Sequence, residues 1–230
     1  MIPLHSWNVA PGEARLLQEG LATQVDTTFD PITPRTIGAV DVSSEWHGSD
    51  LTAGVVVCDA KTLAPIDQAS FHGRASFPYV PGLLSFRELP HVLQAYERLT
   101  IKPDLVLCDG QGIAHPRRLG IASHLGLWLD TPTIGCAKSR LIGVYQEPGP
   151  NRGDWTPLVD RGATIGAVLR TRPKCKPVYV SIGHQMDLRT AIEFVLICTE
   201  KYRLPTPARS VHEYVNRVRR RHQETGVTES

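Results

Sequence analysis

Three acidic residues stand beside apolar runs of this sequence, where an ionised side chain is unusual. Asp41 follows the apolar residues 37–40, Asp109 follows residues 104–108, and Glu88 lies at the start of a predicted helix between them. A carboxylate next to a buried run is costly unless a partner neutralises it. Because Mg²⁺ prefers hard oxygen ligands and keeps several waters, a few carboxylates suffice to bind it. The acids therefore indicate a magnesium site, and the alternative is two turn residues and a helix N-terminal charge.

Two cationic or titratable residues follow apolar runs in the same way. Lys138 comes after residues 134–137, where it could stabilise charge that develops on a phosphate. His184 comes after residues 178–183, where it could act on a proton or lie beside a metal site. The alternatives are a solvated lysine at a strand end and an ordinary loop histidine.

Two further segments suit nucleic-acid contact. Gly110 and Gly112 flank Gln111, and such glycines allow close approach of backbone to a ligand, although the segment matches no phosphate-binding loop. His115 and Arg117 follow with donors suited to phosphate. A stiff aromatic and proline segment could wedge between stacked bases, or be an ordinary ordered loop; it consists of Tyr79, Val80, Pro81 and Gly82.

Hydrophobic periodicity predicts how these residues are positioned. Three strands in a meander come first, followed by alternating helices and strands, and this order predicts an α/β fold with a ribonuclease H-like mixed β-sheet flanked by helices. Pro90 is assigned to the first turn of its helix, where proline is tolerated. The predicted strands are residues 36–42, 51–58, 66–71, 104–108, 132–137, 163–169 and 178–182. The predicted helices are residues 11–25, 119–128 and 207–221, one carrying Leu89 to Leu99 on its face, and one capped by Asp187.

Composition sets the broad class. The chain has 230 residues, 41% of them hydrophobic, a net charge of +2 and five cysteines without a CxxC pair, so we expect one domain over residues 1–230 in a reducing compartment. The start of the chain lacks a signal-peptide pattern, and no apolar run approaches the ~18 residues of a membrane helix, so the expected location is the cytoplasm. The clustered arginines of residues 217–221 could neutralise phosphates, or form a solvated helix face.

Several segments in order along the chain resemble the endonuclease V family, from about residue 36 to residue 207. They are GAVDV (38–42), PYVPG (78–82), LSFRE (84–88), DGQGIAHPRRLG (109–120), ASH (122–124), PTIGCAK (132–138), GH (183–184) and YRLPTP (202–207). Any one of them would be weak support, but together they are strong. Two positions depart from the family pattern: Gln111 stands where histidine is frequent and Cys136 where valine is frequent.

The resemblance implies a function and roles for the residues above. Asp41, Asp109 and Glu88 would bind Mg²⁺, with Mn²⁺ as a substitute, while Lys138 and His184 would support the phosphate and the water. The segment 79–82 would be the wedge, and Gly110, Gly112, His115 and Arg117 would contact the substrate around a flipped base. The enzyme would hydrolyse the second phosphodiester bond 3′ to a deaminated base such as deoxyinosine, leaving a 3′-hydroxyl and a 5′-phosphate.

Three alternatives stay open from the sequence. The chain could bind inosine-containing nucleic acid without cutting it, although its acidic residues are intact. It could act mainly on inosine-containing RNA, because the contacts that distinguish a 2′-hydroxyl have no sequence signature. It could be a ribonuclease H-like nuclease that ignores deaminated bases. One or two metal ions fit the pattern equally, and a monomer without membrane association is expected.

Overall fold

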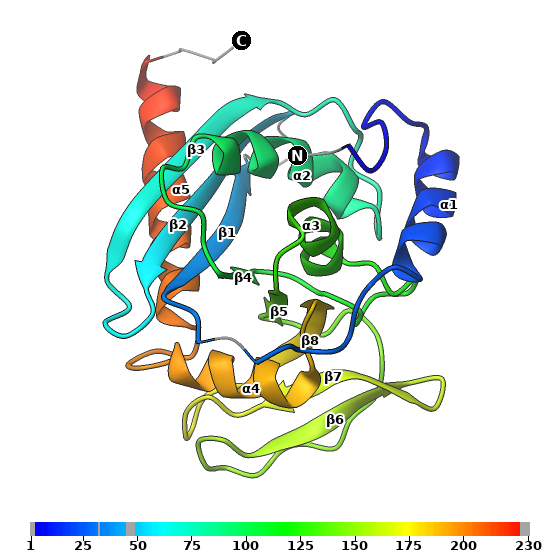
Figure 1. The fold of residues 1–230 in the computed structure, drawn as a ribbon, viewed down its shortest axis with the longest axis vertical. Helices are drawn as coiled ribbons and strands as arrows, with labels where there is room; N and C mark the ends of the chain where they lie inside the picture. The colour runs from blue at the N-terminus through cyan, green and yellow to red at the C-terminus, as the bar shows by residue number, and fades with distance from the viewer. Residues whose placement is uncertain (1–2, 32, 45–48, 226–230) are drawn as a thin grey trace.

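All eight strands of the structure belong to one mixed β-sheet (Figure 1). The structure, a computed structural model, describes residues 3–31, 33–44 and 49–225. The strand order is β3-β2-β1-β4-β5-β8-β7-β6. The strands are β1 (Thr36–Ser44), β2 (Asp50–Asp59), β3 (Pro65–Arg74), β4 (Leu105–Cys108), β5 (Thr133–Ala137), β6 (Trp155–Asp160), β7 (Ala163–Leu169) and β8 (Val178–His184).

Three neighbouring strands, β1, β4 and β5, are parallel, and every other neighbouring pair is antiparallel. In the register, Val40 pairs with Cys108, and Cys108 pairs with Gly135. The carboxyl ends of the three parallel strands therefore meet at one edge of the sheet. β1 continues to Ser44, so Asp41 within β1 lies beside Asp109, the residue that follows β4.

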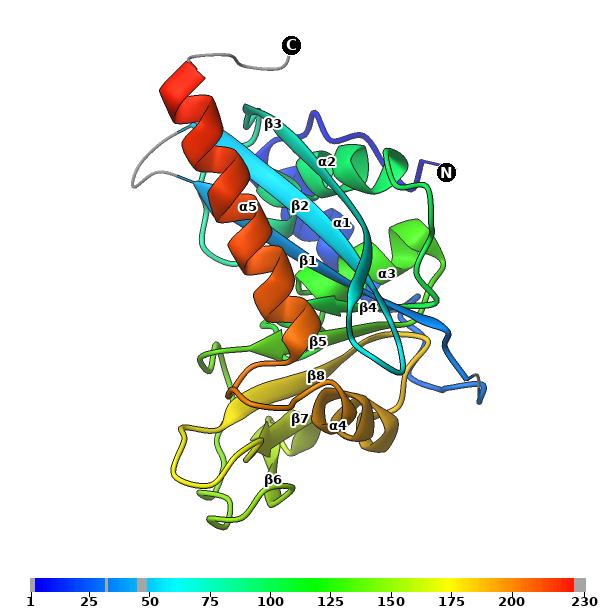
Figure 2. The same cartoon turned by 90° about the vertical axis from the view of Figure 1, so that its left-hand side faces the viewer.

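Helices cover both faces of the sheet (Figure 2). They are α1 (Pro11–Ala22), α2 (Leu84–Glu97), α3 (Ile121–Leu129), α4 (Leu188–Ile197) and α5 (Thr206–Thr225). α2 and α3 pack on one face and α4 and α5 on the other, so two separate cores form. Successive side chains of β1 alternate between them, because Ala39 belongs to the core under α4 and α5 and Val40 to the core under α2 and α3.

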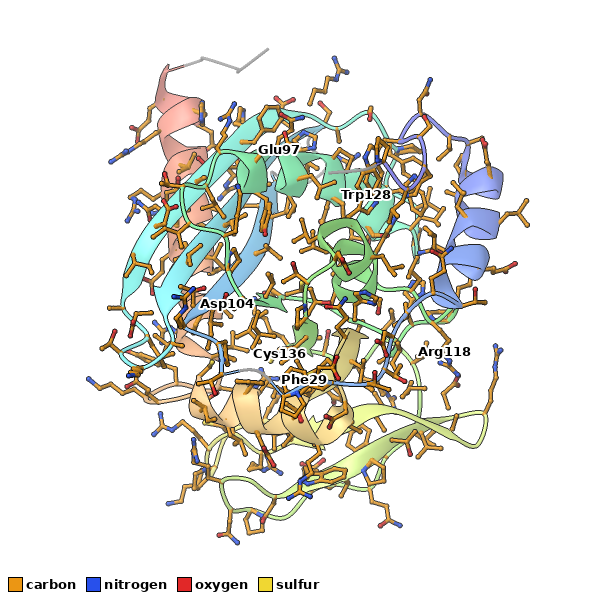
Figure 3. All side chains as sticks on the ribbon, in the orientation of Figure 1. Phe29, Glu97, Asp104, Arg118, Trp128 and Cys136 are labelled. Atoms are coloured by element: carbon orange, nitrogen blue, oxygen red, sulfur yellow. The ribbon has the colours of Figure 1, made fainter. Side chains whose placement is uncertain are left out.

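The interior cysteines fit this packing. Cys58, Cys108, Cys136 and Cys198 are buried and free, as small apolar side chains are expected to be. Cys136 lies among the packed side chains in the middle of the molecule (Figure 3). Among the described residues, no helix has the length and apolarity needed to cross a membrane.

The α/β prediction is confirmed, with three local differences. The helix predicted for residues 11–25 ends at Ala22. β6 was not predicted, because this edge strand contains Pro157 and only one fully buried side chain. The placement of Pro90 in a first turn is wrong: α2 begins at Leu84, so Pro90 lies inside the helix, where the carbonyl of Phe86 loses its helical hydrogen-bond donor. Glu88 consequently lies one turn into α2.

Candidate active site

The three predicted acids come together at the edge where the parallel strands end. Asp41 and Asp109 follow the paired residues Val40 and Cys108 of β1 and β4. Glu88 approaches from α2, and all three acids line one small cavity whose other walls are apolar. The sequence prediction that these carboxylates share a site is therefore matched by their positions.

Burial makes this group of negative charges unfavourable by itself. Desolvation, followed by the charge of Asp41, raises the pKa of Glu88 to about 8. Desolvation also raises the pKa of Asp41, against the lowering effect of its hydrogen bond to His212. A carboxyl group whose pKa is raised in this way gains from a nearby cation.

Lys138 supplies one cation at this edge. It follows β5 directly, and its Nζ donates to Oδ2 of Asp109 at 2.5 Å. The lysine side chain is 43% exposed, so its ammonium group remains accessible from solvent. Its predicted position beside the acids is matched by this contact.

His212 is a site residue that the sequence prediction missed. It comes from α5 on the opposite face of the sheet from Glu88, and its Nδ1 donates to Oδ2 of Asp41 at 2.8 Å. Its Nε2 lies 3.2 Å from Nδ2 of Asn216, which can donate to it. These two contacts fit a neutral imidazole that carries its proton on Nδ1. No sequence pattern relates His212 to Asp41, because they lie 171 positions apart.

His184 does not join this group, and its predicted place at the site is wrong. β8 runs antiparallel to β5 and pairs His184 with Thr133, at the start of β5, whereas Lys138 follows its end. The five-residue separation of Thr133 and Lys138 puts about 16 Å between the two positions. Nδ1 of His184 accepts from the backbone N–H of Asp26, and the side chain is buried.

A larger cavity of about 390 Å³ shares Asp109 with the small acidic cavity, and Lys138 lines it as well. Its other walls are formed by the wedge segment (residues 79–82), the turn at Gly110, buried polar side chains and the loop after β5. The lining residues include Tyr79, Val80, Pro81, Gly82, Ser85, Gly110, Gln111, His115, Ser139 and Arg140. Tyr79 is 72% exposed at the rim of this cavity.

Arg117 and Gly112, two predicted substrate contacts, are not among the lining residues. Arg117 instead holds the wedge segment, since its Nη2 donates to the carbonyl of Gly82 at 2.7 Å and its Nε to Oε1 of Gln18. Gln18, a buried residue of α1 that was not predicted, also donates to Gly82 O. Gly112 packs against β8, because a Cβ there would meet the carbonyl oxygen of Ile182.

His115 lies at the cavity wall in its neutral form. Its Nδ1 accepts from the backbone N–H of Arg117 at 3.2 Å. Burial, followed by the charge of Arg117, lowers the pKa of His115 to about 4. Arg118 is paired with Asp160 of β6 at 2.7 Å, so this guanidinium anchors the loop and does not line the cavity.

Comparison with known proteins places the chain in a family. The family model of endonuclease V matches residues 19–213. Endonuclease V of Trichormus variabilis is 52% identical over 206 residues, which cover 89% of this chain and 93% of that protein. Endonuclease V of Myxococcus xanthus is 49% identical over 215 residues, which cover 93% of this chain and 92% of that protein. The chain belongs to the endonuclease V family.

Solved endonuclease V structures share its fold. The one from Streptomyces avermitilis matches with a TM-score of 0.90 at 41% identity, covering 95% of this chain and 96% of that one. The one from Ciona intestinalis, in complex with a 23mer DNA containing an inosine followed by a ribo-adenosine, matches with a TM-score of 0.81 at 26% identity. It covers 93% of this chain and 99% of its own. The ribonuclease H-like fold predicted from the sequence is thereby confirmed.

In this member of the endonuclease V family, two of the three acids already accept a hydrogen bond from a side chain. Oδ2 of Asp109 is bound by Lys138 and Oδ2 of Asp41 by His212. Within residues 3–31, 33–44 and 49–225, no three acidic, histidine or cysteine side chains converge in a ready-made metal cluster. The three carboxylates nevertheless line one cavity. Besides burial, the negative charges of neighbouring acids contribute to the raised pKa values of Glu88 and Asp41.

Proposed function

We propose that this chain is a magnesium-dependent endonuclease that cuts a nucleic-acid strand at the second phosphodiester bond 3′ to a deaminated purine such as deoxyinosine. One observation carries the proposal: the small acidic cavity and the larger cavity share Asp109, and Lys138, which donates to Asp109, also lines the larger cavity. A base held in the cavity would leave the adjacent backbone at the carboxylates. The inosine-containing DNA bound by the Ciona intestinalis relative supports this choice of substrate.

The donor set fits a hard divalent cation. Asp41, Asp109 and Glu88 would hold it through carboxylate oxygens, and Mn²⁺ would substitute for Mg²⁺. When bound, the ion lowers the pKa of a coordinated water and stabilises the leaving oxygen. It would also relieve the mutual repulsion of the acids, which burial makes strong.

The remaining residues would neutralise the phosphate and hold the Asp41 carboxylate and the wedge segment in place. The ammonium group of Lys138, which is held at 2.5 Å from Asp109, would offset the charge of the phosphate that is cut. His212 holds the Asp41 carboxylate in one orientation through its Nδ1–H. Arg117 and Gln18 fix the carbonyl of Gly82 and thereby hold the wedge segment at the cavity rim.

Selectivity would arise in the larger cavity. Tyr79 is exposed at its rim, where an aromatic side chain can fill the space that a flipped base leaves in the stack. Flipping is cheaper for a mispaired base than for a paired one, so deaminated purines would enter preferentially. The cavity, of about 390 Å³, would accommodate one nucleobase, and Gln111 and His115 place polar side chains in its wall.

The proposal is tested by nicking assays on matched DNA and RNA oligonucleotides that contain one inosine or none. With magnesium, we expect one nick at the second bond 3′ to inosine in DNA, none in the unmodified strand, and none with chelator. Equal cutting of strands without inosine would mean a nuclease that ignores the base. A nick confined to RNA would reassign the substrate, and binding to inosine without any nick would indicate a non-catalytic binder.

A further inference from the structure

One face of α5, here called its outer face, begins at His212 beside the acidic site and continues along the helix to Arg220. His212 contacts Asp41 at 2.8 Å, Asn216 contacts Ser43 at 3.0 Å, and Arg219 donates to the carbonyl of Ser44 at 3.3 Å. The helix therefore accompanies β1 past the carboxylates, and it extends beyond the sheet toward its C-terminal end (Figure 2). From His212 to Arg220 the helix rises about 12 Å.

A shallow hollow on this face connects the site to basic side chains. His212 and Asn216 line it together with three arginines and two glutamates, namely Arg217, Arg220, Arg221, Glu213 and Glu224. A second hollow on the neighbouring flank, over β3, shares Arg217 and Arg221. α5 carries five arginines and two glutamates, a surplus of three positive charges, whereas the whole chain has a net charge of +2. The positive charge of the chain is thus concentrated beside the acidic site.

The acidic group separates two surfaces. The larger cavity lies on the side of β4 and β5, where Lys138 and the loop after β5 form its wall. The α5 hollow lies on the side of β1, and it reaches the carboxylates through His212. A strand that leaves the cavity and crosses the carboxylates would next meet the arginines of α5.

We propose that the outer face of α5 binds the phosphates of the nucleic-acid strand on the 3′ side of the bond that is cut. The direction rests on the proposed function, in which the cut lies 3′ to the base in the cavity. Guanidinium groups up to about 12 Å along the helix from His212 are suited to bind backbone phosphates. Such contacts do not depend on the identity of the bases. The face would lengthen the footprint downstream without affecting which base is chosen.

The test compares strands that carry one inosine and extend either about two or about twelve nucleotides beyond the expected cut. Nicking kinetics with magnesium are measured for the parent, for the double variant Arg217→Gln/Arg220→Gln, and for Arg189→Gln. Arg189 is a matched control, because it lies on α4 with a side chain that is 90% exposed. A third strand is extended by the same length on its 5′ side only.

We expect the parent to have a lower KM for the long 3′ strand than for the short one. The double variant should lose this gain, with KM rising about two-fold to ten-fold at unchanged kcat. Its KM should also depend less on salt, with the slope falling by about 0.7 for each phosphate that the variant no longer neutralises. The short strand and the 5′-extended strand should be cut as by the parent, and Arg189→Gln should behave as the parent throughout.

Two results would overturn the assignment. If the double variant cut the long 3′ strand with the parental KM and salt slope, the arginines would be a solvated face or a surface for an acidic protein. If it weakened the 5′-extended strand equally, the direction would be wrong. Failure of the proposed function itself would look different, because the parent would then not nick the short inosine strand.

Discussion

Gln111 lines the larger cavity with a buried amide side chain. Its Nε2 donates to the carbonyl of Ser139 at 3.0 Å, which fixes the orientation of the amide. Its Oε1 is buried and has no hydrogen-bond partner among the described residues. An unpaired buried acceptor is costly, so a base that offers an N–H group at this wall would be favoured.

The Gln111→Met variant tests this idea, because methionine keeps the length of the side chain and removes the acceptor. We expect kcat/KM for an inosine strand to fall by up to about ten-fold, the value of one hydrogen bond. The free energy of unfolding should change by less than about 1 kcal/mol, since the orphaned acceptor and the hydrogen bond to Ser139 disappear together. An unchanged kcat/KM would show that Oε1 does not face the substrate.

His115 gives the protein a pH-dependent stability with a defined direction. Its pKa is about 4 in the folded chain, below the ordinary value of about 6.5. Between these values the unfolded chain binds a proton that the folded chain does not, so stability falls as pH falls from about 6.5 to about 4. The loss from this histidine is at most about 3 kcal/mol.

The His115→Gln variant should lose less stability over the same pH window than the parent. Other buried histidines with lowered pKa values, such as His124, affect both proteins equally. The quantity to measure is therefore the difference between the parent and the variant in how the free energy of unfolding changes with pH. Urea unfolding at several pH values gives it. Parallel curves for parent and variant would contradict a neutral His115 in the folded state.

Among the elements, every strand except β6 was predictable from the sequence, and the docking of the helices was not. Asp41 and Asp109 each follow a buried apolar run, and parallel strands bring such residues to one edge. His184 shows the same local pattern, yet it lies at the other edge because β8 is antiparallel to β5. Strand direction is a property of the whole topology, so the local pattern could not distinguish the two cases.

His212 and Gln18 were missed for a related reason. The apolar face of α5 packs on β1 and β2 through Val211 and Val215. His212 lies on the polar side and meets Asp41 only because of the angle at which α5 crosses the sheet. Gln18 similarly depends on how α1 docks against the wedge segment. Neither docking geometry is encoded in a short stretch of sequence.

Gly112 links the loop after β4 to β8, and we expect Gly112→Ala to destabilise the protein by several kcal/mol. A Cβ there would lie 1.8 Å from the carbonyl oxygen of Ile182, so the backbone of one of the two segments must move. Gly20→Ala is the matched control, because nothing lies within 4 Å of a Cβ at that helical position. That control should be stabilised by up to about 1 kcal/mol.

Thermal or urea unfolding of the two variants measures both effects. A parental stability for Gly112→Ala would mean that the loop is free to shift. Gly112 would then be available for the substrate contact that the sequence predicted.

For the whole molecule, a cation bound by the three acids should stabilise the fold. A ligand that binds only the folded state at about 100 times its Kd adds about 2.7 kcal/mol. For a chain of 230 residues this corresponds to a rise in Tm of roughly 5–10 °C. Magnesium should produce this rise in the parent, chelator should reverse it, and Asp109→Asn should show little of it.

The same variant separates metal binding from general salt effects. Asp109→Asn removes one charge from a repelling group, so its Tm without metal should equal or exceed that of the parent. An equal magnesium shift in parent and variant would mean that the ion binds elsewhere.

The most direct measurement is the single-turnover rate at which a DNA strand with one inosine is nicked in magnesium by the parent, Asp109→Asn and His212→Ala. If the acidic edge beside the cavity is the catalytic centre, each variant should nick at least about a hundred-fold more slowly while still binding the strand. Nicking by Asp109→Asn at the parental rate would contradict this and place the chemistry elsewhere in the molecule.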